Sequence, residues 1–334
     1  MQLGFHLTPF FSPPERPPAQ IIDEVIEVVR AASTMGYAWV SAPQHWLAYP
    51  TAWPQPYPLL ARLAPESGTM RLKTSVLLLP LLNPVEVAEN VATLDHLTHG
   101  RLTLGVAIGY RDEELQAVGL TRRDRVGKFE ESLQVMKRLW AGEEVTYSGK
   151  YITLSGARLG FGPYQTPYPP IEVGAQSQGA VRRAARLADG IFLGPQVAWR
   201  DIQELVGVYK HERQQAGHQD LGMIGASRCL IVGRDKADAA ARAHDYVART
   251  FANYQRWRMQ ERTMVPLQLD FAQGLDTWTI HGSPQDCVET IQQAQQEIGL
   301  EYIGFTIYSL PTDVQARIDY LQMIAEEIVA KLRE

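Results

Sequence analysis

Short apolar segments alternate with amphipathic segments along the whole chain. The apolar segments have the length and composition of strands that are buried on both faces. These predicted strands cover residues 3–7, 38–41, 72–79, 102–106, 171–173, 191–193, 227–232 and 302–307. The amphipathic segments repeat their apolar residues at helical spacing, as Ile22, Val25, Ile26 and Val29 do in the first of them. These predicted helices cover residues 19–35, 59–64, 85–97, 125–140, 178–188, 199–216, 237–252, 284–298 and 313–332.

The order of the elements predicts the fold class. Strands that are each followed by a helix, with no break in composition, are typical of an α/β protein built as a (β/α)8 TIM barrel. A doubly wound sheet would carry a glycine-rich nucleotide fingerprint after its first strand, and here Gly4 stands alone. We therefore expect one barrel domain over residues 1–334. Two insertions are expected, at 142–170, where 145–154 resembles a β-hairpin, and at 253–281, which we expect to be irregular.

Composition and charge narrow the class of function. The formal net charge of -5 and the absence of a basic stripe argue against nucleic acid or an anionic membrane as the partner. The two cysteines, Cys229 and Cys287, form no disulfide framework and have no metal-type spacing, so we expect no metal site. The longest apolar runs are far below the length of a membrane span, and the first residues do not resemble a signal peptide. These features favour a cytoplasmic enzyme.

The segment Arg101–Tyr110 joins an apolar strand to a glycine-containing tip, and an acidic helix start follows it. Strand interiors avoid glycine unless the backbone must bend or another group must approach closely. Gly105 and Gly109 therefore indicate either a surface that contacts a ligand or tight packing within the barrel. The residues alone leave both explanations open.

Two further strand ends carry candidate chemistry. The turn Gly174–Ala175–Gln176–Ser177 directly precedes a helix, and the exposed N–H groups and dipole of a helix N-terminus favour an anion. The alternative is that Ser177 only caps this helix. His45 follows the second strand and is flanked by aromatic residues, so it is the best acid–base candidate, with a purely structural loop histidine as the alternative.

In their order and spacing, several motifs resemble the bacterial-luciferase-like family of flavin-dependent oxidoreductases. They are spread over residues 77–190: Leu77–Pro84, Ala88–Asp95, Gly100–Tyr110, Phe129–Leu133, Leu139–Glu143, Pro169–Gly174 and Arg182–Gly190. The resemblance implies a TIM-like barrel that binds reduced flavin, or a deazaflavin, in a cleft at the carboxyl ends of the strands. It also implies a β-bulge in the third strand behind the flavin ring, often with a non-prolyl cis peptide bond, which would fall here at Ser75–Val76.

The same resemblance suggests which residues contact the cofactor. His45 matches a family histidine near the reactive face of the ring. Gln176, Ser177 and Gln178 match the seat of the phosphate. The complete set of expected cofactor-binding residues is Ser75, Val76, Asn83, Ile108, Gly109, Tyr110, Gly174, Ala175, Gln176, Ser177 and Gln178.

The chain departs from the family pattern at Ile108. Some members carry a phosphate-binding arginine at this position. Its absence leaves the phosphate to backbone N–H groups, Ser177 and a loop arginine such as Arg122, Arg123 or Arg125. We therefore expect modest affinity for FMN, which fits a loosely held cofactor.

The leading hypothesis is a flavin-dependent monooxygenase that uses reduced FMN and O2 to oxidise a small, apolar or aromatic substrate. A separate flavin reductase would supply the reduced FMN, and His45 would orient or protonate the reacting groups. The aromatic loop at 46–57 and the insertion at 253–278 would cover the substrate. By analogy with the family, we expect a homodimer formed through the helix at 84–97 and the helix that begins near residue 59.

Two alternatives remain open. One is hydride transfer with a deazaflavin, coenzyme F-420, whose longer anionic tail would require more positive groups at the mouth of the barrel. Those groups could be Arg111, Arg122, Arg123, Arg125 and Lys128. The other is a non-catalytic flavin-binding barrel, against which the presence of His45 argues.

Overall fold

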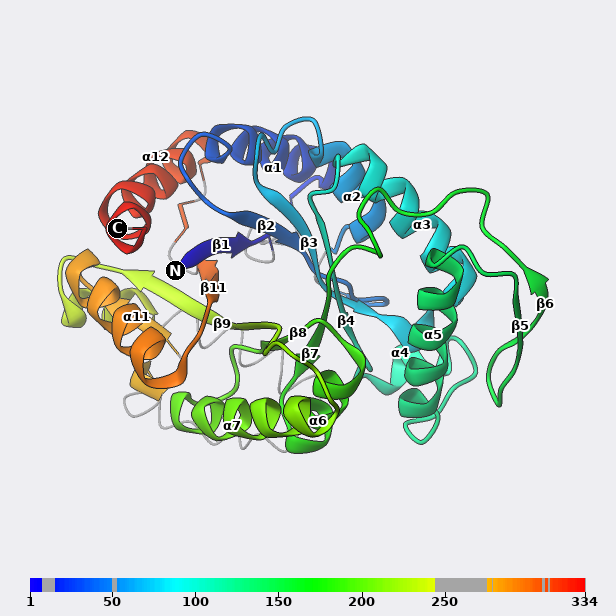
Figure 1. The fold of residues 1–334 in the computed structure, drawn as a ribbon. Coiled ribbons are helices and arrows are strands. Elements are labelled where there is room, and N and C mark those ends of the chain that lie inside the picture. Colours follow the sequence, from blue (N-terminus) through cyan, green and yellow to red (C-terminus); the bar gives the residue numbers. More distant parts are fainter. Residues whose placement is uncertain are drawn as a thin grey trace.

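A closed parallel barrel forms the centre of the protein (Figure 1). The computed structural model describes residues 1–7, 16–49, 53–243, 275–277, 279–307, 310–311 and 313–333. Eight parallel strands follow each other around the barrel in the order β9-β11-β1-β2-β3-β4-β7-β8, and the pairing of β8 with β9 closes it. The TIM-barrel prediction is confirmed.

All the strands predicted for the barrel are present, with ends that differ by a few residues. Their bounds are β1 (Gln2–His6), β2 (Trp39–Ala42), β3 (Arg71–Leu78), β4 (Leu102–Ala107), β7 (Ile171–Ala175), β8 (Gly190–Leu193), β9 (Met223–Val232) and β11 (Tyr302–Ile307). The helices surround them as an outer layer in Figure 1. Their bounds are α1 (Pro18–Ala32), α2 (Pro56–Leu63), α3 (Pro84–Leu97), α4 (Asp112–Gln116), α5 (Arg125–Trp140), α6 (Gln178–Leu187), α7 (Trp199–Gln215), α11 (Pro284–Ile298) and α12 (Val314–Ile324).

Local sequence signals explain where several helices begin and end. Proline, whose fixed φ suits the first helical turn, opens α1, α2, α3 and α11. Ser283 and Asp286 form a reciprocal capping box at the start of α11, and Gly299 ends that helix with a left-handed φ of 78°. The last predicted helix is not uniform, since α12 passes into a π-helical segment at Ala325–Val329 and a 3-10 turn at Ala330–Leu332.

The two predicted insertions have different outcomes. The first contains the expected antiparallel hairpin, β5 (Val145–Ser148) and β6 (Thr153–Ala157), and Glu131 of α5 anchors its turn by accepting from the N–H groups of Tyr151 and Ile152. Of the second, residues 253–274 and 278 lie outside the described part. Its end is not irregular, because β10 (Thr279–Gly282) pairs in parallel with β9. The predicted helix at 237–252 is described only to residue 243, and residues 236–243 are helical.

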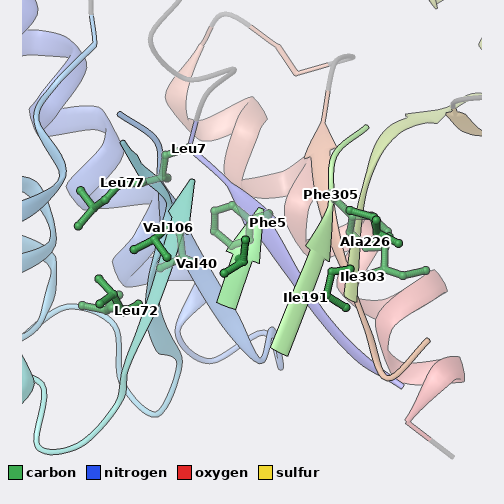
Figure 2. Packing of buried hydrophobic residues seen from close by; sticks show 14 of the residues in the cluster. Phe5, Leu7, Val40, Leu72, Leu77, Val106, Ile191, Ala226, Ile303 and Phe305 are labelled. Carbon is green, nitrogen blue, oxygen red and sulfur yellow. The ribbon is translucent and has the colours of Figure 1, made fainter. Parts of the chain in front are cut away.

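The main apolar core lies between the strands and the helices. In a strand, alternate residues point to opposite faces, and the apolar set of each barrel strand faces outward to the helices. Figure 2 shows part of this core, which includes Phe5, Val40, Ile191, Ile303 and Phe305. The helices contribute residues such as those of the buried face of α1. Among the described helices, none has both the length and the apolarity needed to cross a membrane.

The other face of the strands fills the barrel with aromatic and charged side chains. Trp39, Phe192 and Tyr302 form a buried cluster, and the Nζ atom of Lys73 lies 4.1 Å from the centroid of the Tyr302 ring and 4.5 Å from that of Trp39. Lys73 also forms a buried ion pair of 2.7 Å with Glu172 on β7. This layer fills the interior of the barrel with side chains below the carboxyl ends of the strands.

Candidate active site

A cavity of about 470 Å³ opens at the carboxyl ends of the strands. This volume is within the usual range for a site that binds a cofactor or a small molecule. Most of the residues expected to bind a cofactor line it, together with the expected catalytic residue. They are His45, Ser75, Val76, Ile108, Gly109, Tyr110, Gly174, Ala175, Gln176 and Ser177.

Two of the expected residues are not brought to the cavity. Asn83 is the N-cap of α3, where its side-chain oxygen accepts from the N–H of Val85. This capping bond turns the side chain toward its own helix. Gln178 is exposed on α6, and its side chain donates to Glu204 of α7. The prediction that these two side chains contact the cofactor finds no support in their positions.

The wall formed by β3 and β4 has the expected irregularity. The register of the two strands shifts between Thr74 and Leu77, and the peptide bond Ser75–Val76 is cis, as the family resemblance implied. Beyond the shift, Gln44 accepts from the N–H of Leu78 at 2.7 Å, which fixes the end of β3 beside the cavity. The two glycines of β4 and its tip have different roles. A Cβ atom at Gly105 would collide with the carbonyl oxygen of Thr74, whereas Gly109 lines the cavity with a φ of 73°.

His45 is held by a buried carboxylate. Its Nδ1 lies 2.8 Å from Oε1 of Glu114, a residue of α4 whose side chain is 1% exposed. The same oxygen accepts from the N–H of Trp46 at 2.9 Å. A carboxylate on Nδ1 fixes the proton on that nitrogen, so a proton can be exchanged with a bound molecule through Nε2. Glu114 was not singled out from the sequence, although it lies in the acidic helix start after the glycine-containing tip.

Further contacts fix the loop that carries His45. Arg111 donates to the carbonyl oxygens of Trp46 and Leu47, at 2.6 and 3.1 Å. Gln55 donates to the carbonyl of His45 and accepts from the indole N–H of Trp46. The ring of Trp53 packs edge-on against the imidazole of His45, and Tyr110 does so from the β4 side. These contacts pre-position the imidazole at the cavity.

The part of the cavity between the tip of β4 and the start of α6 is suited to an anion. Ser177 precedes α6, its hydroxyl makes no capping bond, and it lines the cavity with Arg125 of α5. Arg125 donates to the carbonyl of Gly109 at 2.8 Å, so its guanidinium lies beside the tip that contains Ile108. Burial first, and then the charges of Arg122 and Arg183, lower the pKa of Arg125, and a bound anion would relieve this repulsion.

Comparison with known proteins gives the family. The profile of the luciferase-like monooxygenases matches residues 1–301. The chain belongs to the luciferase-like monooxygenase family. An uncharacterised protein of Mycobacterium tuberculosis is 33% identical over 172 residues, which are 51% of this chain and 60% of that relative. The chain thus matches less than two thirds of the length of this relative.

Solved structures agree on the fold. The oxygenating constituent of 3,6-diketocamphane monooxygenase from Pseudomonas putida, in complex with FMN, superposes with a TM-score of 0.85 at 20% identity, over 99% of this chain and 98% of that one. An F420-dependent secondary alcohol dehydrogenase, in complex with an F420–acetone adduct, gives 0.77 at 16% identity, over 98% of both chains. This luciferase-like oxidoreductase therefore shares its barrel with enzymes that use FMN and with enzymes that use F420.

Sequence reasoning missed one side of this luciferase-like site. Phe192, Gln196, Ser227 and Thr306 line the cavity, and so does His6, which had no assigned role. Gln196 follows β8, Ser227 lies in the middle of β9, and the other three lie at or near the carboxyl ends of their strands. Because alternate residues of a strand point to the same face, counting in steps of two along each strand would have identified those that lie in strands. Among the described residues, no group of three or more His, Cys, Asp or Glu is placed to hold a metal ion.

His6 is expected to remain uncharged over the physiological pH range. Its Nδ1 lies 2.6 Å from the hydroxyl of Ser41, and burial, followed by the charge of Lys73, lowers the pKa of His6 from 6.5 to about 3. In an NMR titration, its ring signals should not move between about pH 8 and pH 5. The unfolded chain takes up this proton first, so stability should fall as the pH drops from about 6.5 toward 3, by up to about 1.4 kcal/mol per pH unit. A midpoint near pH 6 for the His6 signals would contradict this assignment.

Proposed function

We propose that the protein is an FMN-dependent monooxygenase that uses reduced FMN and O2 to oxidise a small, uncharged organic substrate. The observation that carries the proposal is that one cavity joins a positively charged anion seat, Ser177 with Arg125, to a carboxylate-held histidine, His45 with Glu114. Between them lie the irregular wall of β3 and mainly apolar side chains. A phosphate at one end and a flat ring at the other match this division.

The residues present fit FMN. Val76 lies at the irregular wall, and Gly174 of β7 faces it, where a Cβ atom would come within 3.2 Å of the Val76 side chain. The absence of a side chain at Gly174 leaves room for a flat ring against this wall. The hydroxyl of Ser177, the guanidinium of Arg125 and the N–H groups at the start of α6 would hold the phosphate. When bound, reduced FMN supplies the electrons that activate O2.

The chain itself contributes acid–base chemistry and exclusion of water. His45 would donate a proton at Nε2 to the reacting oxygen or to the substrate, while Glu114 keeps the ring oriented and balances its positive charge. Trp53 and Tyr110 shield this imidazole from two sides. A mainly apolar lining of this kind limits the access of water to the reacting groups.

The arrangement of the arginines favours FMN over F420. The longer anionic tail of a deazaflavin would need several free cations at the mouth of the cavity. Arg111 donates to the carbonyl oxygen of Trp46 in the loop that carries His45. Arg122 forms a two-point ion pair with Asp112. Of the five basic residues considered for this role, Arg125 is the one that lines the cavity. One cation suits the single phosphate of FMN.

Two partners belong to the same proposal. A separate reductase would deliver the reduced FMN, in keeping with a seat that relies on one arginine. A second copy of the chain would pack against α3, where Leu97 is 50% exposed, and against α2. Both remain proposals drawn from the family.

The anion seat can be tested with Arg125→Met. We expect the affinity for FMN to fall about tenfold to hundredfold, because a charge-assisted hydrogen bond to the phosphate is lost. The affinity for riboflavin, which lacks the phosphate, should stay unchanged. Fluorescence titration with both flavins measures this difference, and Arg123→Met, which removes the same charge from an exposed residue, is the matched control. Equal losses for FMN and riboflavin would contradict the phosphate assignment.

A further inference from the structure

The cavity has two halves that differ in the strands that line them. The residues assigned above to FMN belong to β3, β4 and β7 and their ends. The remaining part, which we term the substrate half, is formed at β8, β9, β11 and β1 by Phe192, Gly194, Gln196, Ser227, Thr306 and His6. None of these six residues carries a permanent charge, and His6 is held neutral by burial. This half is therefore suited to an uncharged molecule with polar groups.

A pair of carboxamides stands where the two halves meet. Gln176 follows β7, Gln196 follows β8, and Nε2 of Gln176 donates to Oε1 of Gln196 at 2.9 Å. Both residues line the cavity, although Gln196 is only 7% exposed. The bond leaves Oε1 of Gln176 as an acceptor and Nε2 of Gln196 as a donor. Within the described part of the chain, these two atoms have no protein hydrogen-bond partner.

The surrounding structure is shaped to hold this pair. A Cβ atom at Gly194 would lie 2.7 Å from Nε2 of Gln176 and 2.9 Å from Oε1 of Gln196, so only glycine leaves room for the bond. The loop that carries Gly194 and Gln196 is fixed by Arg228, which is fully buried. Its guanidinium donates to the carbonyl of Val197 at 2.9 Å and stacks on the ring of Trp199 at 3.9 Å. The free donor and acceptor are thus held in fixed positions.

The bonded carboxamide pair offers the cavity one donor and one acceptor, which specify the chemistry of a ligand. A ligand that bonds to both atoms in the cavity gains affinity over one that bonds to neither. The complementary group places an N–H beside a C=O. Building on the assignment of the other half to FMN, we propose that Gln176 and Gln196 recognise an uncharged substrate with an amide-type group, such as a lactam or a carboxamide.

FMN does not place an N–H beside a C=O at the position of Gln176 and Gln196. The ring of FMN also contains an N–H between two carbonyls, but the ribityl chain separates that edge from the phosphate. Ser177, which directly follows Gln176, belongs to the phosphate seat. With the phosphate there, the polar edge of the ring lies at the far end of the molecule. The pair therefore remains available to the substrate.

The test uses protein saturated with FMN and two probes, δ-valerolactam and its N-methyl derivative, which lacks the N–H. We expect the wild-type protein to bind the lactam about fivefold to tenfold more tightly than the N-methyl compound, as one buried hydrogen bond predicts. Ligand-observed NMR titration gives both dissociation constants. Gln176→Met removes the free acceptor that would take the N–H of the lactam, and Gly194→Ala forces the pair apart. In both variants the preference should fall to about onefold.

The outcomes separate this proposal from the proposed function. Failure of the wild-type protein to bind FMN would contradict the proposed function. Normal FMN binding with equal affinity for the two probes, or a preference that survives both substitutions, would overturn the assignment of the carboxamide pair. A loss of FMN affinity in Gln176→Met that matches its loss of lactam affinity would assign the pair to the cofactor instead. Thermal unfolding of each variant checks that it is folded. The two substitutions disturb the pair in different ways, since one removes a carboxamide and the other adds a Cβ atom.

Discussion

Replacing His45 by alanine is expected to lower kcat by about a hundredfold to ten-thousandfold, the usual contribution of a positioned acid or base. The reason is that Nδ1 is committed to Glu114, so the imidazole can exchange a proton with a bound molecule through Nε2. KM should change little, because His45 is not one of the residues assigned to the anion seat. The measurement is steady-state turnover of an accepted substrate under a constant supply of reduced FMN and O2.

Glu114→Gln provides the matched test of this arrangement. Glutamine keeps the size of the side chain but can offer an N–H to Nδ1, which disturbs the orientation and the proton distribution of the ring. We expect a loss of at least about tenfold in kcat together with a changed pH profile. His211→Ala, on an exposed position of α7, should leave turnover unchanged. Full activity of His45→Ala would remove this residue from the chemistry.

The substitution Lys73→Met is expected to cost about 3–5 kcal/mol of folding free energy. It leaves the carboxylate of Glu172 buried in the barrel without its counter-charge, which lies 2.7 Å away in the intact protein. Burial and the charge of Glu172 raise the pKa of Tyr302, so its hydroxyl stays neutral and supplies no counter-charge. Urea denaturation followed by circular dichroism measures the loss.

A second substitution distinguishes lost charge balance from lost packing. In Lys73→Met with Glu172→Met, no unpaired charge remains, and most of the lost stability should return. Arg62→Met, which breaks an exposed ion pair with Glu66, should cost no more than about 1 kcal/mol. If the single and the double variant are equally unstable, Lys73 acts by packing among the aromatic rings and not by its charge.

The sequence predicted the barrel well because its strands are signalled locally. Each barrel strand is an apolar run bounded by turn residues, and proline and glycine mark several helix ends. The strand β10 was missed, because Thr279–Gly282 is short and adjoins a segment without periodic pattern. It exists through pairing with the far end of β9, and such a long-range contact leaves no signal in the local sequence.

The site was predicted less completely for a related reason. Residues close to a motif, such as His45 and Ser177, could be named from the family resemblance. Glu114 and Gln196 acquire their roles only when separate loops meet above the barrel. Asn83 was grouped with the cofactor residues, but in the structure it is the N-cap of α3 and does not line the cavity.

The measurement that tests the central claim most directly is a side-by-side titration of the purified protein with FMN and with F420. The account predicts that FMN binds and that F420 binds at least about tenfold more weakly, because Arg125 is the single one of the proposed arginines at the cavity. Oxidation of a substrate should then require O2. Tighter binding of F420, or full turnover without oxygen, would contradict the assignment of an FMN-dependent monooxygenase.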